Sequence, residues 1–109
     1  MELIIKGAFA IETGDGFTIH PRVIELLKEV ERSKSLNSAV KTLGMSYSHA
    51  WSLIYKTNCK LESPLLITKR GGNGGGIAEL THSGQTLLDH YKKLEADFNN
   101  FIGDHMIEL

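Results

Sequence analysis

The chain has 109 residues, enough for one domain with a single modest core. Hydrophobic residues make up 41% of it and charged residues 23%, a balance that excludes a wholly disordered chain. No apolar run approaches the ~18–20 residues that span a membrane, and the first residues lack the features of a secretory signal. The lone Cys59 excludes an internal disulfide, so we expect a cytoplasmic protein with no membrane partner.

The net charge of −1 is unevenly distributed along the chain. Residues 28–70 contain eight basic and three acidic side chains and carry +5, whereas residues 1–27, 71–84 and 85–109 carry −2, −1 and −3. A basic middle between acidic ends is expected when one face of a protein meets phosphate. A chance fluctuation in a neutral protein would look the same, so charge alone does not decide the partner.

The N-terminal third of the chain predicts one strand and one helix. Apolar residues crowd the segment Leu3–Ile11, and the turn signal at residues 14–16 closes it, so we expect a strand there. Pro21 suits the first turn of a helix, which should end at residues 34–35. The apolar positions of that helix recur at three- and four-residue spacing and define one buried face: Val23, Leu26, Leu27 and Val30.

Residues 35–61 predict two short helices joined by a tight turn. Ser35 or Asn37 can cap the first helix, Gly44 can end it in a left-handed conformation, and Ser46 can cap the second. We expect the second helix to turn four residues inward: Ala50, Trp51, Ile54 and Leu61. Two helices joined by a turn that contains glycine match the helix-turn-helix unit.

A β-hairpin, or wing, is expected over residues 65–80. Pro64 bars a further helix, and the strand-like segments Leu65–Thr68 and Ile77–Leu80 flank a tip of six residues, five of them glycine. A hairpin directly after the second helix extends the helix-turn-helix unit to a winged helix.

The last helix is expected over about residues 82–105, with Thr81 or Ser83 as its cap. Its apolar residues are spaced by four, three, four and three positions, the heptad pattern of a coiled coil: Leu87, Tyr91, Leu94, Phe98 and Phe101. We expect these residues to form a dimer interface, with cover of the domain's own core as the alternative. A two-fold dimer would present two reading helices to a palindromic site.

The second helix of such a unit enters the major groove of DNA with its N-terminal residues at the base edges. Hydroxyl, phenol, imidazole and amine groups that can contact phosphates or bases follow one another along it: Ser46, Tyr47, Ser48, His49, Ser52 and Lys56. Lys69 and Arg70 at the rim of the wing suit phosphate or minor-groove contact. For any single one of these residues, an ordinary solvent-exposed position explains the sequence equally well.

Other chemistry finds no support in the sequence. The glycine run lacks the dinucleotide pattern because Ile77 stands at the third glycine position, and no lysine follows Gly76 as a phosphate-binding loop requires. Five histidines are scattered without cysteine or carboxylate partners at metal-ligand spacing: His20, His49, His82, His90 and His105. No arrangement of catalytic residues stands out, so we expect no enzyme activity, no metal and no cofactor.

Two stretches, residues 44–51 and residues 71–84, resemble the N-terminal DNA-binding domain of the molybdate-responsive ModE family, which is itself similar to the winged helix of LysR-type regulators. The glycine-rich wing that ends in Leu80-Thr81-x-x-Gly84 is the most specific part. The resemblance extends over nearly the whole chain and implies wing contacts from Lys69 to Asn73 and dimerisation through the first and last helices. It also implies recognition positions in the second helix of the unit: Ser46, Tyr47, Ser48, His49 and Ser52. Full-length members continue into a molybdate-binding region that this sequence does not contain, so molybdate sensing is not expected.

The sequence therefore predicts a mostly α-helical winged helix-turn-helix fold with a small β wing, an N-terminal strand and a long C-terminal dimerisation helix, in one domain over residues 1–109. The expected function is that of a bacterial, homodimeric transcriptional regulator that binds double-stranded DNA at a specific sequence. The alternative is a winged helix that binds a protein partner and no DNA. No small-molecule effector is identified by the sequence.

Overall fold

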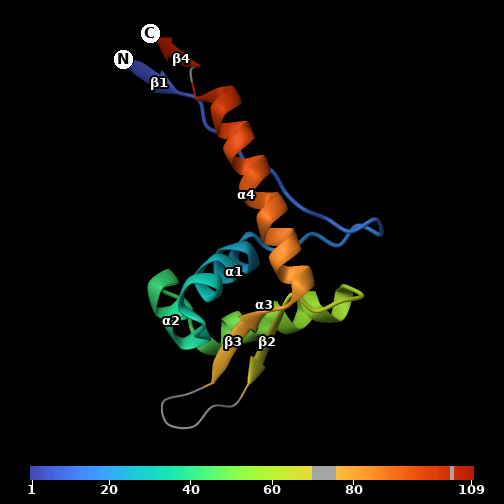
Figure 1. Ribbon diagram of the computed structural model, residues 1–109. Coiled ribbons are helices and arrows are strands. Elements are labelled where there is room, and N and C mark those ends of the chain that lie inside the picture. The colour runs from blue at the N-terminus through green and yellow to red at the C-terminus, as the bar shows by residue number, and fades with distance from the viewer. Residues whose placement is uncertain (70–75, 104) are drawn as a thin grey trace.

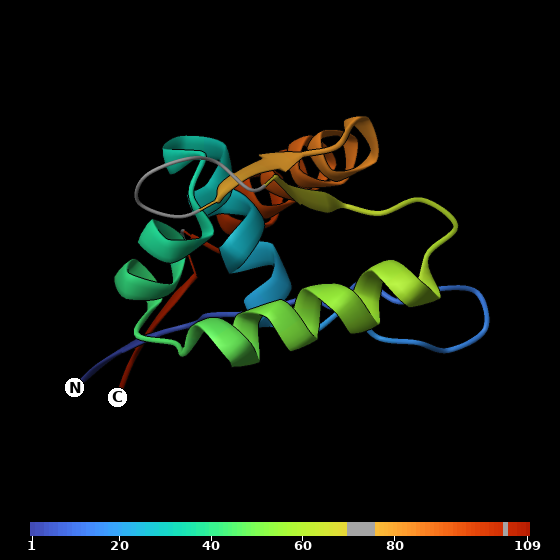
Figure 2. The ribbon, with the colours of Figure 1, turned by 90° about the horizontal axis from the view of Figure 1, so that it is seen from below.

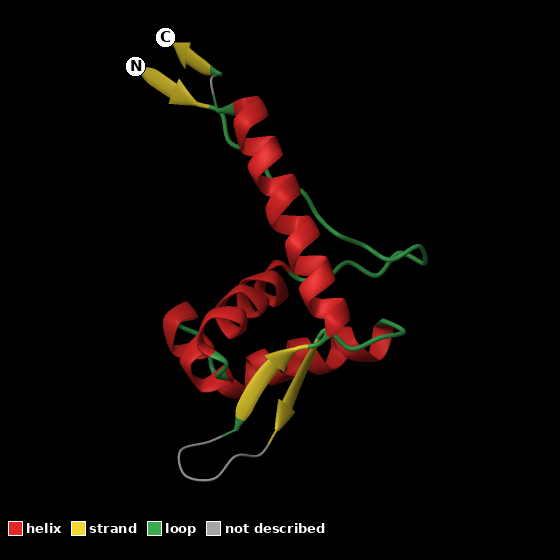
Figure 3. Ribbon diagram, in the orientation of Figure 1, coloured by secondary structure: helices red, strands yellow, loops and turns green. Residues whose placement is uncertain are grey.

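A computed structural model describes residues 1–69, 76–103 and 105–109. Within these residues the fold is mostly helical, with two small antiparallel sheets of two strands each (Figures 1 and 3). The elements in chain order are β1 (Glu2–Ile4), α1 (Pro21–Ser33), α2 (Leu36–Leu43), α3 (Tyr47–Lys60), β2 (Leu66–Lys69), β3 (Ile77–Leu80), α4 (His82–Ile102) and β4 (Met106–Glu108).

Helix α1 lies at the centre of the core and packs against α2, α3, α4 and β3. Pro21 occupies its first turn as predicted, and the buried face contains the four expected residues together with Ile24. Leu26, Leu27 and Val30 are completely buried. Because burying one such side chain stabilises a fold by about 1.5–3 kcal/mol, this helix contributes a large share of the core.

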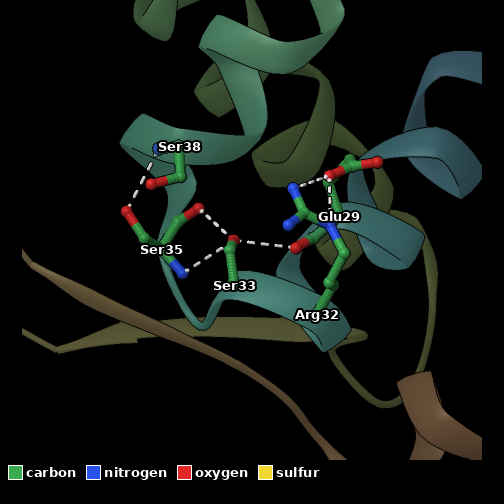
Figure 4. A network of polar contacts seen from close by, with 5 residues as sticks. All are labelled: Glu29, Arg32, Ser33, Ser35 and Ser38. Carbon is green, nitrogen blue, oxygen red and sulfur yellow. Dashed lines mark hydrogen bonds and ion pairs between the residues drawn. The ribbon is translucent and has the colours of Figure 1, made fainter.

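The junction between α1 and α2 is a local network of hydrogen bonds (Figure 4). Lys34 ends α1 with a left-handed backbone, at φ 57°. The Ser33 hydroxyl donates to the Glu29 carbonyl oxygen at 2.8 Å, and the Ser35 side chain accepts from the Ser38 N–H at 3.1 Å. Ser35, and not Asn37, is therefore the cap of α2.

The turn between α2 and α3 forms as predicted. Gly44 takes the left-handed conformation at φ 66°, and its N–H bonds back to the end of α2. Ser46 caps α3, because its hydroxyl accepts from the His49 N–H at 3.2 Å. Leu61 follows the last residue of α3 and is half-buried, so it covers the core from beyond the helix end.

The β2–β3 hairpin is tied to both neighbouring helices. Its strands pair from Leu66 opposite Leu80 to Lys69 opposite Ile77. The Asn58 side chain on α3 donates to the Leu66 carbonyl oxygen at 3.1 Å and accepts from the Leu65 N–H at 2.9 Å. On the other side, the Ala78 N–H donates to the Lys34 carbonyl oxygen at 3.0 Å. The hairpin therefore has a fixed position beside α3.

The exit from the hairpin into α4 is closely packed. The Thr81 hydroxyl caps α4 by accepting from the Gly84 N–H at 3.0 Å, and it donates to the Pro64 carbonyl oxygen at 2.5 Å. A Cβ atom on Gly84 would overlap the Leu65 carbonyl group, with its carbon only 2.9 Å away. Glycine is required here by the close approach of two backbones.

The N-terminal strand is much shorter than the predicted Leu3–Ile11. Only Glu2–Ile4 is a strand, and it pairs with β4 from the other end of the chain. The segment that follows has no strand beside it, apart from one isolated bridge between Glu12 and Thr18. Phe9 of this segment instead lies against α4. The Phe9 ring stands 4.8 Å from that of Tyr91 and 6.1 Å from that of Phe98.

Helix α4 extends beyond the rest of the molecule and gives it an elongated shape (Figure 1). The radius of gyration is 16.3 Å, against about 13 Å for a compact domain of this length. The helix ends at Ile102, short of the predicted residue 105, because the chain turns at Gly103 into β4. None of the described helices is long and apolar enough to cross a membrane.

Candidate nucleic-acid interface

Helix α3 and the hairpin lie at the same end of the molecule, away from the termini (Figure 1). Seen from below, α3 crosses this end along its whole length, with the hairpin beside it (Figure 2). The buried residues of α3 are Ala50, Ile54 and Thr57, so the opposite face of the helix is left to solvent.

Most of the predicted reading residues lie on the accessible part of α3. Tyr47 is 45% exposed, and Ser48, His49 and Lys56 are also exposed, whereas Ser52 is half-buried. The four-residue spacing of Ser48, Ser52 and Lys56 brings them onto one stripe of the helix. Ser46 lies outside the helix, where its hydroxyl is already bonded to the His49 N–H.

The predicted wing residues are only partly described. Lys69 is exposed at the end of β2, and its amine lies 3.5 Å from the Glu79 carboxylate on β3. An exposed pair of this kind contributes little to stability, so the lysine can exchange its partner at low cost. Arg70 and Asn73 lie outside the described residues.

Two aromatic residues of α3 were not included among the predicted contacts. Trp51 was expected to turn inward, but its side chain is 47% exposed, and that of Tyr55 is 56% exposed. Their rings stack with centroids 5.2 Å apart and planes at 9°. The four-residue spacing of Tyr47, Trp51 and Tyr55 was the available signal, because the buried residues follow a different stripe of the helix.

The basic side chains of the chain's middle section are used in two ways. Lys28 and Arg32 on α1 form ion pairs with Glu95 and Glu29, at 3.1 and 2.6 Å. Lys56 on α3 and Lys41 on α2 form no ion pair with any residue that the structure describes. Charge available for an external anion is therefore found on the helices of the predicted reading unit.

The contact between α1 and α4 includes a buttressed carboxylate. Glu31 accepts hydrogen bonds from the Gln85 amide and the Lys92 amine, both on α4. The pKa of Glu31 is lowered below its ordinary value of 4.5, mainly by the hydrogen bond from Gln85 and next by that from Lys92.

Outside the gaps at 70–75 and 104, no group of three histidine, cysteine or carboxylate side chains could hold a metal ion.

The predicted seam on α4 is divided between two environments. Leu87, Tyr91 and Phe98 are half-buried against their own chain, and Phe9 covers the latter two. Leu94 is 54% exposed and Phe101 is 76% exposed. The chain's own N-terminal segment therefore covers part of the predicted seam, while Leu94 and Phe101 are left exposed. Pairing of two chains through this helix stays a prediction.

The structure thus combines α2 and α3, which are joined by a capped turn, with the antiparallel β2–β3 hairpin. This arrangement is compatible with a winged helix. Comparison with curated proteins identifies several relatives, most of them named ModE. The chain is 42% identical over 74 residues to the DNA-binding transcriptional dual regulator ModE of Escherichia coli K12, which covers 68% of this chain and 28% of that protein. It is 32% identical over 91 residues to the molybdenum transport protein ModE of Azotobacter vinelandii, covering 84% of this chain and 34% of the relative.

A third relative is the molybdenum-pterin-binding protein MopA of Rhodobacter capsulatus, 33% identical over 87 residues, which covers 76% of this chain and 33% of that protein. No protein-family model matches the sequence. The chain is a relative of the ModE regulators, as the resemblance of residues 44–51 and 71–84 predicted. It spans about a third of the length of these relatives.

Proposed function

We propose that this chain is a winged helix-turn-helix regulator that binds double-stranded DNA at a specific sequence, with α3 in the major groove and the hairpin beside it. The main support is the exposed, polar start of α3 at the same end as the hairpin, which Asn58 holds in place. The names of the ModE relatives, which are transcriptional regulators, agree with this function. We also propose that the protein is cytoplasmic and that it is not an enzyme.

Phosphate contact is assigned to the exposed lysines around this end, Lys56 on α3 and Lys69 on β2. Arg70 would extend the same contact from the wing, and Asn73 would add a polar contact at its tip. Each phosphate that the protein neutralises releases counterions. A plot of the logarithm of the binding constant against the logarithm of the salt concentration should therefore have a negative slope of about 0.9 for each phosphate contact. Lys56→Ala should reduce this slope by about one.

The decisive experiment is enrichment of bound sequences from a pool of random DNA duplexes. The wild-type protein should enrich one motif, and the His49→Ala/Ser52→Ala variant should bind that motif more weakly, by about 5- to 150-fold for each lost base contact. Thr86→Ala, on the exposed side of α4, is the matched control and should bind as wild type does. No enriched motif, with a protein captured on the α3 face instead, would favour a protein-interaction module.

We further propose that the regulator is a homodimer, paired through α4. The support is the exposure of Leu94 and Phe101 on a helix that extends away from the core. The dimer interface would also include the exposed parts of three half-buried side chains, Leu87, Tyr91 and Phe98. A two-fold dimer would place two copies of α3 for a palindromic operator, with half-sites about one helical turn apart or a multiple of it.

Sedimentation analysis tests the dimer. Wild-type protein should sediment with twice the mass of the chain, and the Leu94→Glu/Phe101→Glu variant with the mass of one chain. Asn99→Glu/Asn100→Glu, which adds the same two negative charges at exposed polar positions of α4, should remain a dimer. A wild-type monomer that still selects a palindrome would refute pairing through this helix.

A further inference from the structure

The stacked pair Trp51 and Tyr55 is the largest exposed aromatic surface on α3. The two rings lie one helical turn apart and hold each other nearly parallel, so neither packs into the core. Half-exposed rings that are already ordered in the free protein lose little conformational freedom when a partner covers them. The pair is therefore a pre-formed apolar contact surface.

The pair lines a small hollow between α3 and the hairpin. Leu66 and Thr68 of β2 and Leu36 of α2 also line it. The hollow has a volume of about 130 Å³, below the range of about 300–1,000 Å³ that is usual for small-molecule sites. Its size therefore argues against a bound cofactor and for contact with part of a larger surface.

The neighbours of the pair on α3 are polar and basic. Ser48 and Ser52 flank Trp51, and Lys56 follows Tyr55. A helix face of this kind is complementary to DNA, whose phosphates are anionic and whose major groove offers hydrogen-bonding base edges. The one apolar feature of that groove is the C5-methyl group of thymine, which proteins read by apolar contact.

We propose that the Trp51–Tyr55 stack reads thymine through its C5-methyl group, an inference that rests on the proposed DNA binding by α3. The serines and Lys56 position the helix by polar contacts, while the ring surface favours a thymine over a cytosine at the position that it covers. Specificity at that position then comes from burial of a methyl group and not from a hydrogen bond.

The test replaces single thymines of the enriched duplex with deoxyuridine, which removes the methyl group and keeps the base pair. Wild-type protein should lose about fourfold in affinity at one or two positions, the expected effect of removing one methyl group that the complex would bury. Trp51→Ala should bind the thymine duplex more weakly and be indifferent to uracil at those positions. Thr86→Ala should keep the wild-type sensitivity.

A second readout needs no variant. Trp51 is the single tryptophan of the chain, so its fluorescence reports directly on this surface. Emission should change when the thymine duplex binds and change less with the uracil duplex at equal saturation. Equal affinity and equal emission for both duplexes would overturn thymine reading while leaving DNA binding intact. Failure to enrich any duplex would overturn the proposed function, and with it this inference.

Discussion

Replacing Gly84 by alanine should destabilise the protein by about 1–3 kcal/mol. The added methyl group would overlap the Leu65 carbonyl, so the start of α4 must move away from the hairpin. Overpacking of this kind costs about 1–3 kcal/mol. The movement also strains the hydrogen bond from the Thr81 N–H to the Leu65 carbonyl oxygen, now 3.1 Å long and worth about 1 kcal/mol. Alanine returns about 1 kcal/mol through its higher helix propensity.

Thermal melting followed by circular dichroism measures this difference. For a chain of this size the loss corresponds to a fall in Tm of about 4–24 °C. Gly14→Ala is the matched control, because a Cβ atom there meets nothing within 4 Å, and its Tm should stay near that of wild type. All samples need one protein concentration, since the Tm would depend on it if the chain pairs as proposed. A Gly84→Ala protein that melts at or above the wild-type temperature would refute the steric argument.

Two further changes test the local structure. Glu31→Gln removes the stability that the carboxylate gains from Gln85 and Lys92. Folding lowers the pKa of Glu31, so the difference in unfolding free energy between wild type and variant should be complete above about pH 5. That difference should shrink as the pH falls below 4.5. Urea unfolding at pH 7 and pH 3.5 checks this, and a gap that widens in acid would contradict it. Ser46→Ala removes the cap of α3 and should cost about 1 kcal/mol in the same assay, whereas Ser46→Gly should cost only a few tenths. Equal losses for the two substitutions would argue that the hydroxyl does not act as a cap.

The helices could be predicted from the sequence because their signals are local. Ser35, Gly44, Ser46 and Thr81 each act on residues within four positions, so their capping roles can be recognised without knowing the rest of the fold. The same applies to the buried stripe of α1, which follows from the period of the helix alone. These elements agree with the structure almost residue by residue.

The extent of the first strand could not be predicted, since it depends on a distant partner. Glu2–Ile4 pairs with Met106–Glu108, and nothing in the first eleven residues indicates where that pairing stops. Phe9, one of the apolar residues that suggested a longer strand, packs on α4 instead, which also explains why only part of the predicted seam is free.

The candidate site was predicted in part for a related reason. The polar residues at the start of α3 are recognisable from their position after the Ser46 cap. Trp51 was grouped with the apolar positions of the helix that were expected to turn inward, yet only Ala50 and Ile54 of that group on α3 are buried, and Trp51 lies beside them, half exposed. Tertiary packing, and not residue type, decides which side of α3 faces solvent.

The meeting of the two chain ends has a consequence for protein engineering. The Met1 amine donates to the Leu109 carbonyl oxygen at 2.6 Å, at the end of α4 far from α3 and the hairpin. A short peptide could join these ends and new termini could be opened in the exposed turn at residues 14–16, giving a circular permutant of the domain. In such a molecule α1 to α4 would keep their order and their contacts. Residues 1 and 109, in turn, are attachment points for labels that leave the α3 face uncovered.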